Sequence, residues 1–287
     1  MNSRRLRLDQ ALVELRLAPS RNRARSLVMA GQVKVAGHRA TKAGMMVREG
    51  VDLVVLSPPR FVGRGGDKLA AALAGSGIDP AGKVCLDVGA STGGFTDCLL
   101  QTGARLVLAV DVGYGQLDWR LRQDDRVVVL ERTNARYLEP STLPRDLPHW
   151  PRLLVIDVSF IGIAKVLPAV GSVCDPHADA LLLVKPQFEC GPHQVGAGGV
   201  VRDPHLRRAA VRSVATSALD LGWSLAGAIP SPVRGAAGNW ECFLHLRRPP
   251  PARPAPHPEQ TIRRLEVPDD RQDVELTDTD ARGQERP

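Results

Sequence analysis

The segment from Leu86 to Thr96 constrains the fold of this 287-residue chain more than any other feature. An apolar run, Val84 to Val88, stops at a glycine-rich turn of the form G-x-S-x-G-G, and an amphipathic run from Phe95 to Leu100 follows directly. This order predicts a buried strand, a tight turn and a helix N-terminus. Glycine lets the backbone approach a ligand closely, and the first turn of a helix offers free N–H groups. The segment therefore predicts a nucleotide-type site in an α/β domain.

Asp111 supports this prediction and narrows it. It follows the next apolar run, Leu106 to Val110, and lies 22 positions after Gly89. At that spacing a carboxylate reaches the ribose hydroxyls in a nucleotide-binding βαβ unit. Ser91 stands where the dinucleotide fingerprint has the glycine that approaches pyrophosphate. A cofactor with a ribose and no pyrophosphate fits better, and S-adenosylmethionine is the obvious one. The alternative is a glycine turn that is purely structural.

The positive charge of the chain is concentrated at its N-terminal end. Residues 1–60 hold 12 Lys/Arg against 4 Asp/Glu, residues 61–246 hold 18 of each, and residues 247–287 hold 8 against 9. A patterned basic segment favours nucleic-acid phosphate as its partner over a basic solubility arm. No aromatic residue precedes Phe61, so we expect recognition of the shape and phosphates of folded RNA rather than base stacking.

Residues 1–56 are expected to form a small α+β module. Apolar residues from Leu8 to Leu17 have near-helical spacing, Ser20 is a plausible N-cap for a second helix over 21–30, and short strands follow at 32–35 and 51–56. The acidic first helix, the Ser-Arg step before the second helix and a G-x-V-x-V-x-G strand resemble an S4 RNA-binding domain. This resemblance implies six basic residues that face RNA: Arg4, Arg5, Arg7, Arg21, Arg25 and Lys42.

The rest of the chain is organised as a linker, a large domain and a tail. We expect a proline-stiffened linker over 57–63, an α/β domain over 64–247 and a disordered Pro-rich, charged tail over 248–287. The expected strands form a seven-stranded, mostly parallel sheet in which the last strand is antiparallel: 83–88, 106–110, 126–130, 152–157, 180–185, 222–228 and 240–247.

Composition excludes several other classes of protein. No apolar run reaches the roughly 18 residues of a membrane span, and the basic N-terminus lacks a signal-peptide core, so we expect a cytoplasmic protein without membrane contact. The five cysteines are odd in number and include no C-x-x-C pair. Neither a disulfide framework nor a zinc site is therefore indicated.

Four ionisable residues stand out by their positions. Asp157 and Lys185 follow apolar strands, so they should lie at the same sheet edge as the glycine turn and Asp111. Lys68 begins a helix just before the cofactor strand, and Glu241 begins the last strand, which reaches the same edge if it is antiparallel. A lysine in such a setting is costly unless it is paired. The alternative is an ion-pair network without catalytic function.

These residues suit proton removal from a weak nucleophile. A hydroxyl that accepts a methyl group must lose its proton as the methyl group arrives, and a lysine held beside the oxygen assists by taking the proton or by stabilising the alkoxide. We assign this role to Lys185, with Asp157 orienting it and Lys68 and Glu241 completing the site. Methyl transfer is in-line, so positioning contributes much of the rate. This chemistry requires no metal.

At this point the sequence resembles the TlyA family, also labelled hemolysin A, whose members join an S4 domain to an FtsJ-like, Rossmann-type methyltransferase domain. The resemblance runs from about residue 4 to 246 and implies methyl transfer from S-adenosylmethionine to ribose 2′-hydroxyls of cytidines in ribosomal RNA, 16S, 23S or both. It also implies the catalytic tetrad Lys68, Asp157, Lys185 and Glu241. The matching segments are 64–69, 86–96, 110–117, 130–136, 157–161, 184–189 and 199–204.

The expected cofactor contacts lie mainly in turns that follow strands. We expect the glycine turn at the methionine end, Asp111 at the ribose, and Thr133 and Asn134 at the adenine, although the last two are equally typical turn residues. The full expected set is Asp87, Gly89, Ala90, Ser91, Thr92, Gly93, Gly94, Phe95, Asp111, Thr133, Asn134 and Asp157.

Three other functions compete with this interpretation. The first is a non-catalytic RNA-binding or ribosome-assembly factor, against which the filled tetrad and intact turn argue. The second is a pore-forming hemolysin, which the absence of amphipathic membrane segments disfavours. The third is a nicotinamide-dependent reductase, which Ser91 disfavours. The partners we expect are ribosomal RNA and ribosomal subunits, and the sequence indicates no protein partner.

Overall fold

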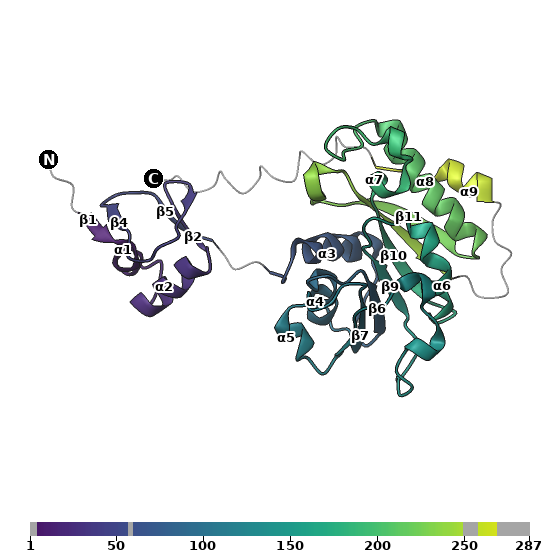
Figure 1. The fold of residues 1–287 in the computed structure, drawn as a ribbon, viewed down its shortest axis with the longest axis horizontal. Helices are drawn as coiled ribbons and strands as arrows, with labels where there is room; N and C mark the ends of the chain where they lie inside the picture. The colour runs from purple at the N-terminus through teal and green to yellow at the C-terminus, as the bar shows by residue number, and fades with distance from the viewer. Residues whose placement is uncertain (1–4, 57–59, 249–257, 269–287) are drawn as a thin grey trace, which may run out of the picture. The chain divides into compact units, whose positions relative to one another are not determined.

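The computed structural model describes residues 5–56, 60–248 and 258–268 (Figure 1). The chain divides into two compact units, residues 1–60 and residues 61–287. Within the described ranges, no helix is long and apolar enough to span a bilayer.

The first unit is a small α+β module. Strand β1 pairs antiparallel with β4, and a second antiparallel sheet has the order β3-β2-β5. Its buried core includes Leu8 and Leu12 from the first helix, Ala24 and Val28 from the second, and Val33 from a strand. The elements are β1 (Arg5–Arg7), α1 (Leu8–Glu14), α2 (Arg21–Met29), β2 (Val33–Val35), β3 (His38–Arg39), β4 (Met46–Arg48) and β5 (Leu53–Val55).

The helices of this unit lie close to their predicted positions. Ser20 caps α2, and its Oγ accepts a hydrogen bond from the backbone N–H of Arg23 at 3.3 Å. Helix α1 ends earlier than expected because Arg16 adopts a left-handed φ of 59°, which leaves Leu15 exposed. The sequence did not predict β1, β3 and β4, since strands of two or three residues carry too little periodicity.

The second unit is built on a seven-stranded sheet of order β11-β12-β10-β9-β6-β7-β8. The strands from β10 to β8 are parallel, whereas β12 is antiparallel to both of its neighbours. The predicted mostly parallel sheet with an antiparallel last strand is therefore confirmed. The strands are β6 (Val84–Val88), β7 (Leu106–Val110), β8 (Val127–Leu130), β9 (Leu153–Ile156), β10 (Asp179–Val184), β11 (Ser224–Pro230) and β12 (Cys242–Arg247).

Helices cover both faces of this sheet (Figure 1). Alternate residues of the central strands point to opposite faces, so Cys85, Val107 and Val155 join one core with α3 and α4, while Leu86 and Leu108 join a second core with α6 and α8. The helices are α3 (Arg64–Ser76), α4 (Gly94–Gln101), α5 (Trp119–Arg122), α6 (Leu167–Ser172), α7 (Pro186–Glu189), α8 (Pro204–Asp220) and α9 (Pro258–Arg264).

The strand order places a ligand crevice at the centre of the sheet. Strand β6 lies between β7 and β9, and the direction of strand succession reverses at this point. In open α/β sheets, ligands bind beyond the carboxyl ends of the strands at such a switch point. The turns after β6, β7, β9 and β10 therefore converge on one edge.

The second unit begins earlier than we predicted. We expected a linker over 57–63, of which residues 57–59 lie outside the described residues. Phe61, however, is buried in the core beside α3, and the backbone N–H of Val62 donates to Asp97 Oδ2 at 2.8 Å. The side chain of Phe61 also fills the space that Gly66 leaves open. Residues 61–63 therefore belong to the α/β unit.

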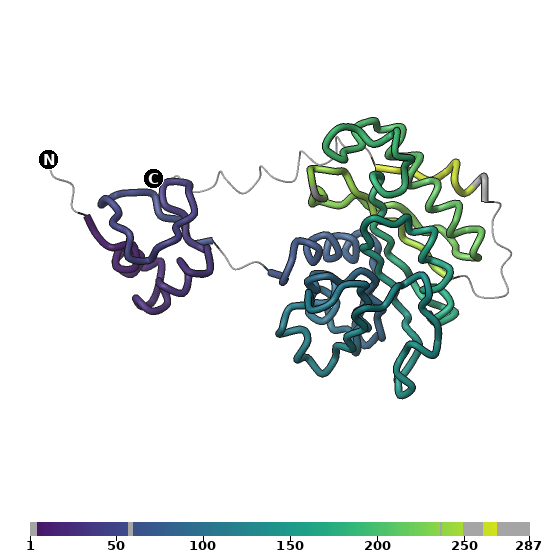
Figure 2. The backbone as a smooth tube through the Cα atoms, in the orientation of Figure 1, coloured from purple at the N-terminus to yellow at the C-terminus, as the bar shows by residue number. Residues whose placement is uncertain are grey.

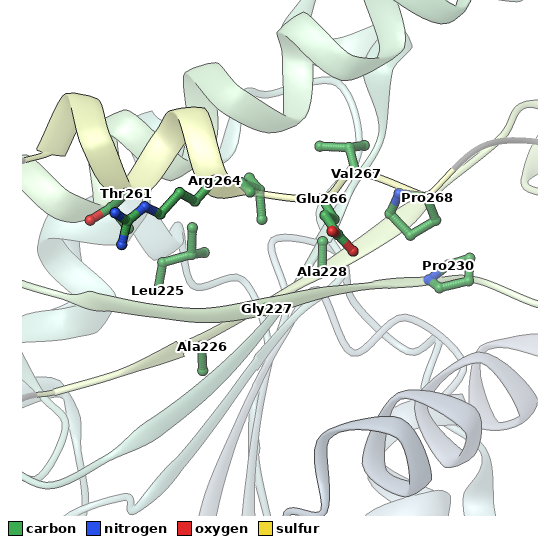
Figure 3. A pocket seen from close by; sticks show the side chains of 11 residues that line it. Leu225, Ala226, Gly227, Ala228, Pro230, Thr261, Arg264, Glu266, Val267 and Pro268 are labelled. Carbon is green, nitrogen blue, oxygen red and sulfur yellow. The ribbon is translucent and has the colours of Figure 1, made fainter.

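The expectation of a disordered tail over 248–287 is wrong for residues 258–268. Helix α9 packs against α8, and Leu265 is buried in the core that α8 shares with the sheet. Figure 2 shows this yellow segment returning beside the sheet, and Figure 3 shows it running over the edge strand β11. A few apolar residues, Ile262, Leu265 and Val267, anchor a segment that otherwise has a charged composition. Residues 249–257 and 269–287 lie outside the described residues.

We predict that Leu265→Ala lowers the free energy of unfolding by about 2–4 kcal/mol, because it removes buried apolar surface and leaves a cavity. Denaturant unfolding monitored by circular dichroism measures this change. The control is Leu221→Ala, since Leu221 is 43% exposed, and it should cost less than about 1 kcal/mol. Equal effects of the two substitutions would contradict the docking of the C-terminal segment.

Candidate active site

The turn after β6 is fixed by contact with the turn after β9. Gly89 has a left-handed φ of 86°, and a Cβ at this position would lie 2.5 Å from the carbonyl oxygen of Asp157. Its backbone N–H donates to the carbonyl oxygen of Val110 at 2.8 Å. Only glycine allows both the conformation and the close approach. The ends of β6, β7 and β9 are therefore held together at one point.

The other glycines of this turn serve helix packing. Gly93 has a φ of 97° and leaves no room for a side chain beside Leu121. Gly94 lies against the backbone of Gly65 and Gly66, so α4 and α3 approach closely at their N-termini. These close contacts fix the position of Lys68 on α3 relative to the turn.

A cavity of about 340 Å³ lies beyond the carboxyl ends of the central strands. Its volume falls in the range of about 300–1,000 Å³ that is typical of small-molecule sites. Asp111 faces it, and the Asp111 carboxylate accepts hydrogen bonds from the backbone N–H groups of Ser91 at 2.7 Å and Gly113 at 2.6 Å. Six of the predicted cofactor residues line this cavity: Gly89, Ser91, Asp111, Thr133, Asn134 and Asp157.

The remaining predicted cofactor residues do not line the cavity. Phe95 is buried in the core, with its ring 6.0 Å from that of Phe243. Asp87 is 0% exposed and accepts a hydrogen bond from Thr96 Oγ1 at 2.6 Å. Both side chains are buried outside the cavity lining, where they support the turn from beneath. The other four predicted residues belong to the turn but do not line the cavity: Ala90, Thr92, Gly93 and Gly94.

Several lining residues were missed by the sequence reasoning. Gln116 follows β7, and the segment 158–161 follows β9. Both lie in turns at the predicted edge of the sheet, and the segment 158–161 also lies within the family motif 157–161. Their position in a turn after a strand was therefore the signal that could have identified them as lining residues. Phe160 is 92% exposed with a left-handed φ of 65°, and its ring lies 5.2 Å from that of Phe188.

The four predicted catalytic residues form two ion pairs. Lys68 Nζ lies 2.5 Å from Glu241 Oε2, and Lys185 Nζ lies 2.6 Å from Asp157 Oδ1. Lys185 Nζ also donates to Ser159 Oγ at 3.0 Å. Because Asp157 and Ser159 line the cavity, the Lys185 amine stands at its rim.

Electrostatics link the two ion pairs. Lys68 and Lys185 are each 8% exposed and Glu241 is 3% exposed. Burial raises the pKa of Glu241, while the positive charges of Lys68 and Lys185 oppose this rise. Glu241 therefore senses both lysines, which places the four groups in one electrostatic neighbourhood.

Gly235 makes room for Glu241, which the sequence did not reveal. A Cβ on Gly235 would overlap the Glu241 carboxylate. The Gly235 N–H donates to the carbonyl oxygen of Asn239 at 2.8 Å, which closes a tight loop before β12. Glu241 thus reaches Lys68 across a position where any other residue would displace it.

A second cavity and the grouping of possible metal ligands add no residue to the site. A cavity of about 850 Å³ lies between the C-terminal segment and β11 (Figure 3), but none of the predicted site residues lines it. Within residues 5–56, 60–248 and 258–268, no group of three or more His, Cys, Asp or Glu side chains could hold a metal ion.

The predicted RNA-facing residues lie on the first unit. Arg5, Arg21, Arg25 and Lys42 are exposed, and Arg7 is partly exposed. Arg7, Arg21 and Arg25 share one buried carboxylate, that of Asp9. Arg4 lies outside the described residues.

The sheet order and the cavity at its carboxyl edge fit a Rossmann-like methyltransferase domain, the class that the matching family model describes. The model of the FtsJ-like methyltransferase family matches residues 61–248, and that of the S4 domain matches residues 6–53. With both domains in this order and the relatives described next, the chain belongs to the TlyA (hemolysin A) family.

Its similarity to individual proteins extends over most of the chain. The 16S/23S rRNA (cytidine-2′-O)-methyltransferase TlyA of Mycobacterium tuberculosis is 50% identical over 247 residues, which cover 85% of this chain and 91% of that protein. Hemolysin A of Brachyspira hyodysenteriae is 37% identical over 84% of this chain and 99% of its own length. A solved structure from Streptococcus thermophilus, named as a hemolysin, is 38% identical, with a TM-score of 0.67 and coverage of 91% and 96%.

The buried Asp87 predicts a pH dependence of stability. Burial raises the pKa of Asp87 to about 7, against an ordinary value of 3.8. The folded protein therefore keeps a proton between about pH 4 and pH 7 that the unfolded chain has released. Its contribution to stability is fully present below about pH 4 and is lost as the pH rises towards 7. Asp87→Asn cannot titrate, so wild type should lose stability relative to this variant over that range.

Denaturant unfolding at a series of pH values measures this difference. The exposed Asp125 provides a control, because Asp125→Asn should follow the wild-type pH profile. Parallel profiles for wild type and Asp87→Asn would show that Asp87 does not carry the proton.

Proposed function

We propose that this protein transfers a methyl group from S-adenosylmethionine to the ribose 2′-hydroxyl of cytidine in ribosomal RNA. The observation that carries this proposal is the Lys185–Asp157 ion pair at the rim of the cavity beside Asp111. The 50% identical relative from Mycobacterium tuberculosis, named for this reaction on 16S and 23S rRNA, supports the choice of substrate.

The residues of the cavity fit the proposed cofactor. Asp111 offers carboxylate oxygens to the ribose hydroxyls, and Thr133 and Asn134 lie on the side assigned to the adenine. Ser91 stands where the dinucleotide fingerprint has its second glycine, so the turn fits a cofactor without a pyrophosphate better than a dinucleotide. When bound, S-adenosylmethionine supplies an electrophilic methyl group on a sulfonium.

Lys185 is the group placed to act on the acceptor. Its Nζ is fixed between Asp157 and Ser159, so the side chain loses little conformational freedom when substrate binds. From this position the Lys185 amine either accepts the 2′-hydroxyl proton or, as an ammonium group, stabilises the negative charge on the oxygen while the proton passes to water. Asp157 both orients the amine and offsets the cost of burying its charge.

Lys68 and Glu241 complete the acceptor side of the site. Their ion pair lies in the same electrostatic neighbourhood as Lys185. We assign to Lys68 a second positive charge near the ribose, held by Glu241. The exposed ring of Phe160 stands at the mouth of the cavity, where it offers an apolar surface to the base of the acceptor nucleotide.

The experiment that tests the proposed function is nucleoside analysis of ribosomal RNA. Ribosomal subunits lacking the modification are incubated with the protein and S-adenosylmethionine, and the RNA is digested and analysed by mass spectrometry. We expect new 2′-O-methylcytidine, mapped to a defined nucleotide in one subunit or both. Methylation of a base, or RNA binding without methylation, would overturn the proposal.

Lys185→Ala should reduce methyl transfer by about 10²–10⁴-fold, because the stabilising charge at the acceptor oxygen is lost. Binding of ribosomal RNA should stay within about twofold. The matched control is Lys83→Ala, which removes a lysine at the start of β6, the opposite end of the sheet. Wild-type activity of the Lys185 variant on ribosomal subunits would contradict its assigned role.

Asp111→Ala should weaken binding of S-adenosylmethionine by about 10–100-fold, since hydrogen bonds between the ribose and a charged group are lost. Isothermal calorimetry measures the affinity directly and requires no RNA. Asp118→Ala, in the loop after β7, is the control, because the Asp118 carboxylate pairs with Arg120 and does not line the cavity. Equal affinity of the Asp111 variant and wild type would exclude the assigned ribose contact.

A further inference from the structure

One buried carboxylate in the first unit binds three arginines. Asp9, in the first turn of α1, has a side chain that is 0% exposed. Its oxygens lie 3.1 Å from Arg7 Nε, 3.3 Å from an Arg21 terminal nitrogen and 3.2 Å from Arg25 Nε. The arginines come from the end of β1 and from one face of α2, where Arg21 and Arg25 are one turn apart.

The arrangement leaves an excess of positive charge. Hydrogen bonds from the arginines, Arg7 first, hold the pKa of Asp9 well below its usual range, so the carboxylate is ionised at neutral pH. Three guanidinium groups around one carboxylate carry a net formal charge of +2. Without Asp9, mutual repulsion would separate the three side chains, because like charges at this distance repel.

The arginines keep donors for a ligand. A guanidinium has five N–H donors, and Arg21 and Arg25 each direct one to Asp9. Their side chains are 52% and 50% exposed, and that of Arg7 is 42% exposed. On its other side, the Arg7 guanidinium occupies the space beside Gly44, where a Cβ would lie 3.0 Å from it. The unused donors therefore face solvent from a cluster whose geometry is already fixed.

We infer that Asp9 is a positioning residue that holds Arg7, Arg21 and Arg25 as a single phosphate-binding site for the RNA backbone. A phosphodiester matches this cluster because its two anionic oxygens accept paired N–H donors from guanidinium groups. The inference rests on the proposed function only in taking RNA as the ligand. Beyond the proposed function, it states that these three arginines bind one phosphate together and that the acidic residue Asp9 holds them in position.

Two possible roles for Asp9 predict opposite changes in RNA affinity when its charge is removed: lowering the positive charge of the surface, or positioning the arginines. If Asp9 only reduced the positive charge of the surface, its neutralisation would strengthen RNA binding. If Asp9 positions the arginines, neutralisation weakens RNA binding even though the net charge rises. The sign of the change in affinity therefore decides between the two.

The test measures binding of the full-length protein to transcribed 16S and 23S ribosomal RNA over a range of salt concentrations. Asp9→Asn should weaken binding by about fivefold to tenfold, and the slope of log K against log salt should fall by about one phosphate contact. The matched control is Glu49→Gln, an equal charge change at an exposed residue of the same unit, which should leave binding unchanged or slightly tighter. Equal or tighter binding by Asp9→Asn would overturn the inference.

A second pair of variants distinguishes loss of the phosphate site from misfolding caused by the substitution of the buried Asp9. Arg21→Lys and Arg25→Lys keep the charge, and both side chains are about half exposed. Each should weaken binding severalfold, because lysine lacks the planar fork. In an Asp9→Asn background, the same substitutions should have little further effect. Wild-type binding by the lysine variants, or effects that add fully, would overturn the inference.

The outcomes separate this inference from the proposed function. If wild type binds ribosomal RNA but transfers no methyl group, the proposed function fails while the phosphate site stands or falls on the Asp9 series. If wild type does not bind either RNA, both are overturned.

Discussion

The close contact between Gly89 and the backbone of Asp157 is the constraint on which the rest of the active site depends. It joins the ends of β6 and β9 at the point where strand succession reverses. The cavity beside Asp111 and the Lys185–Asp157 pair are thereby fixed to the same piece of backbone. In-line methyl transfer requires donor and acceptor to be held at a defined separation. A rigid backbone contact provides this more reliably than a contact between flexible side chains.

Buried or partly buried carboxylates organise cations in both units of the protein. Asp157 and Glu241 each hold a lysine that is almost fully buried, and Asp9 holds three arginines that remain half exposed. Removing a charge from water is costly, so each cation is retained only where an anion compensates it. The difference in exposure suits the two proposed tasks: an enclosed charge would act on one oxygen, whereas an exposed cluster would bind a phosphate on a large RNA.

The features predicted correctly from the sequence are those set by local pattern. Apolar runs in the sequence predicted the seven strands. Because the carboxyl ends of parallel strands lie at one edge of the sheet, the polar residues at these ends, Asp111, Asp157 and Lys185, were predicted to lie together. The sequence could not show that Phe95 and Asp87 are buried outside the cavity lining, because Phe95 is covered by α3 and β12 and Asp87 is bound by Thr96 on α4. Gly235 has no local signal, since its reason is the Glu241 side chain six positions later. The docking of Leu265 was hidden by the charged residues around it.

The central claim is that the site at the sheet edge methylates a ribose oxygen. The most direct measurement is transfer of a labelled methyl group from S-adenosylmethionine to a substrate RNA in which the acceptor cytidine alone lacks its 2′-hydroxyl. We expect the deoxy-substituted RNA to bind but to accept no label, while the unmodified RNA is methylated. Labelling of the deoxy-substituted RNA at the same nucleotide would contradict it, because the acceptor would then be the base.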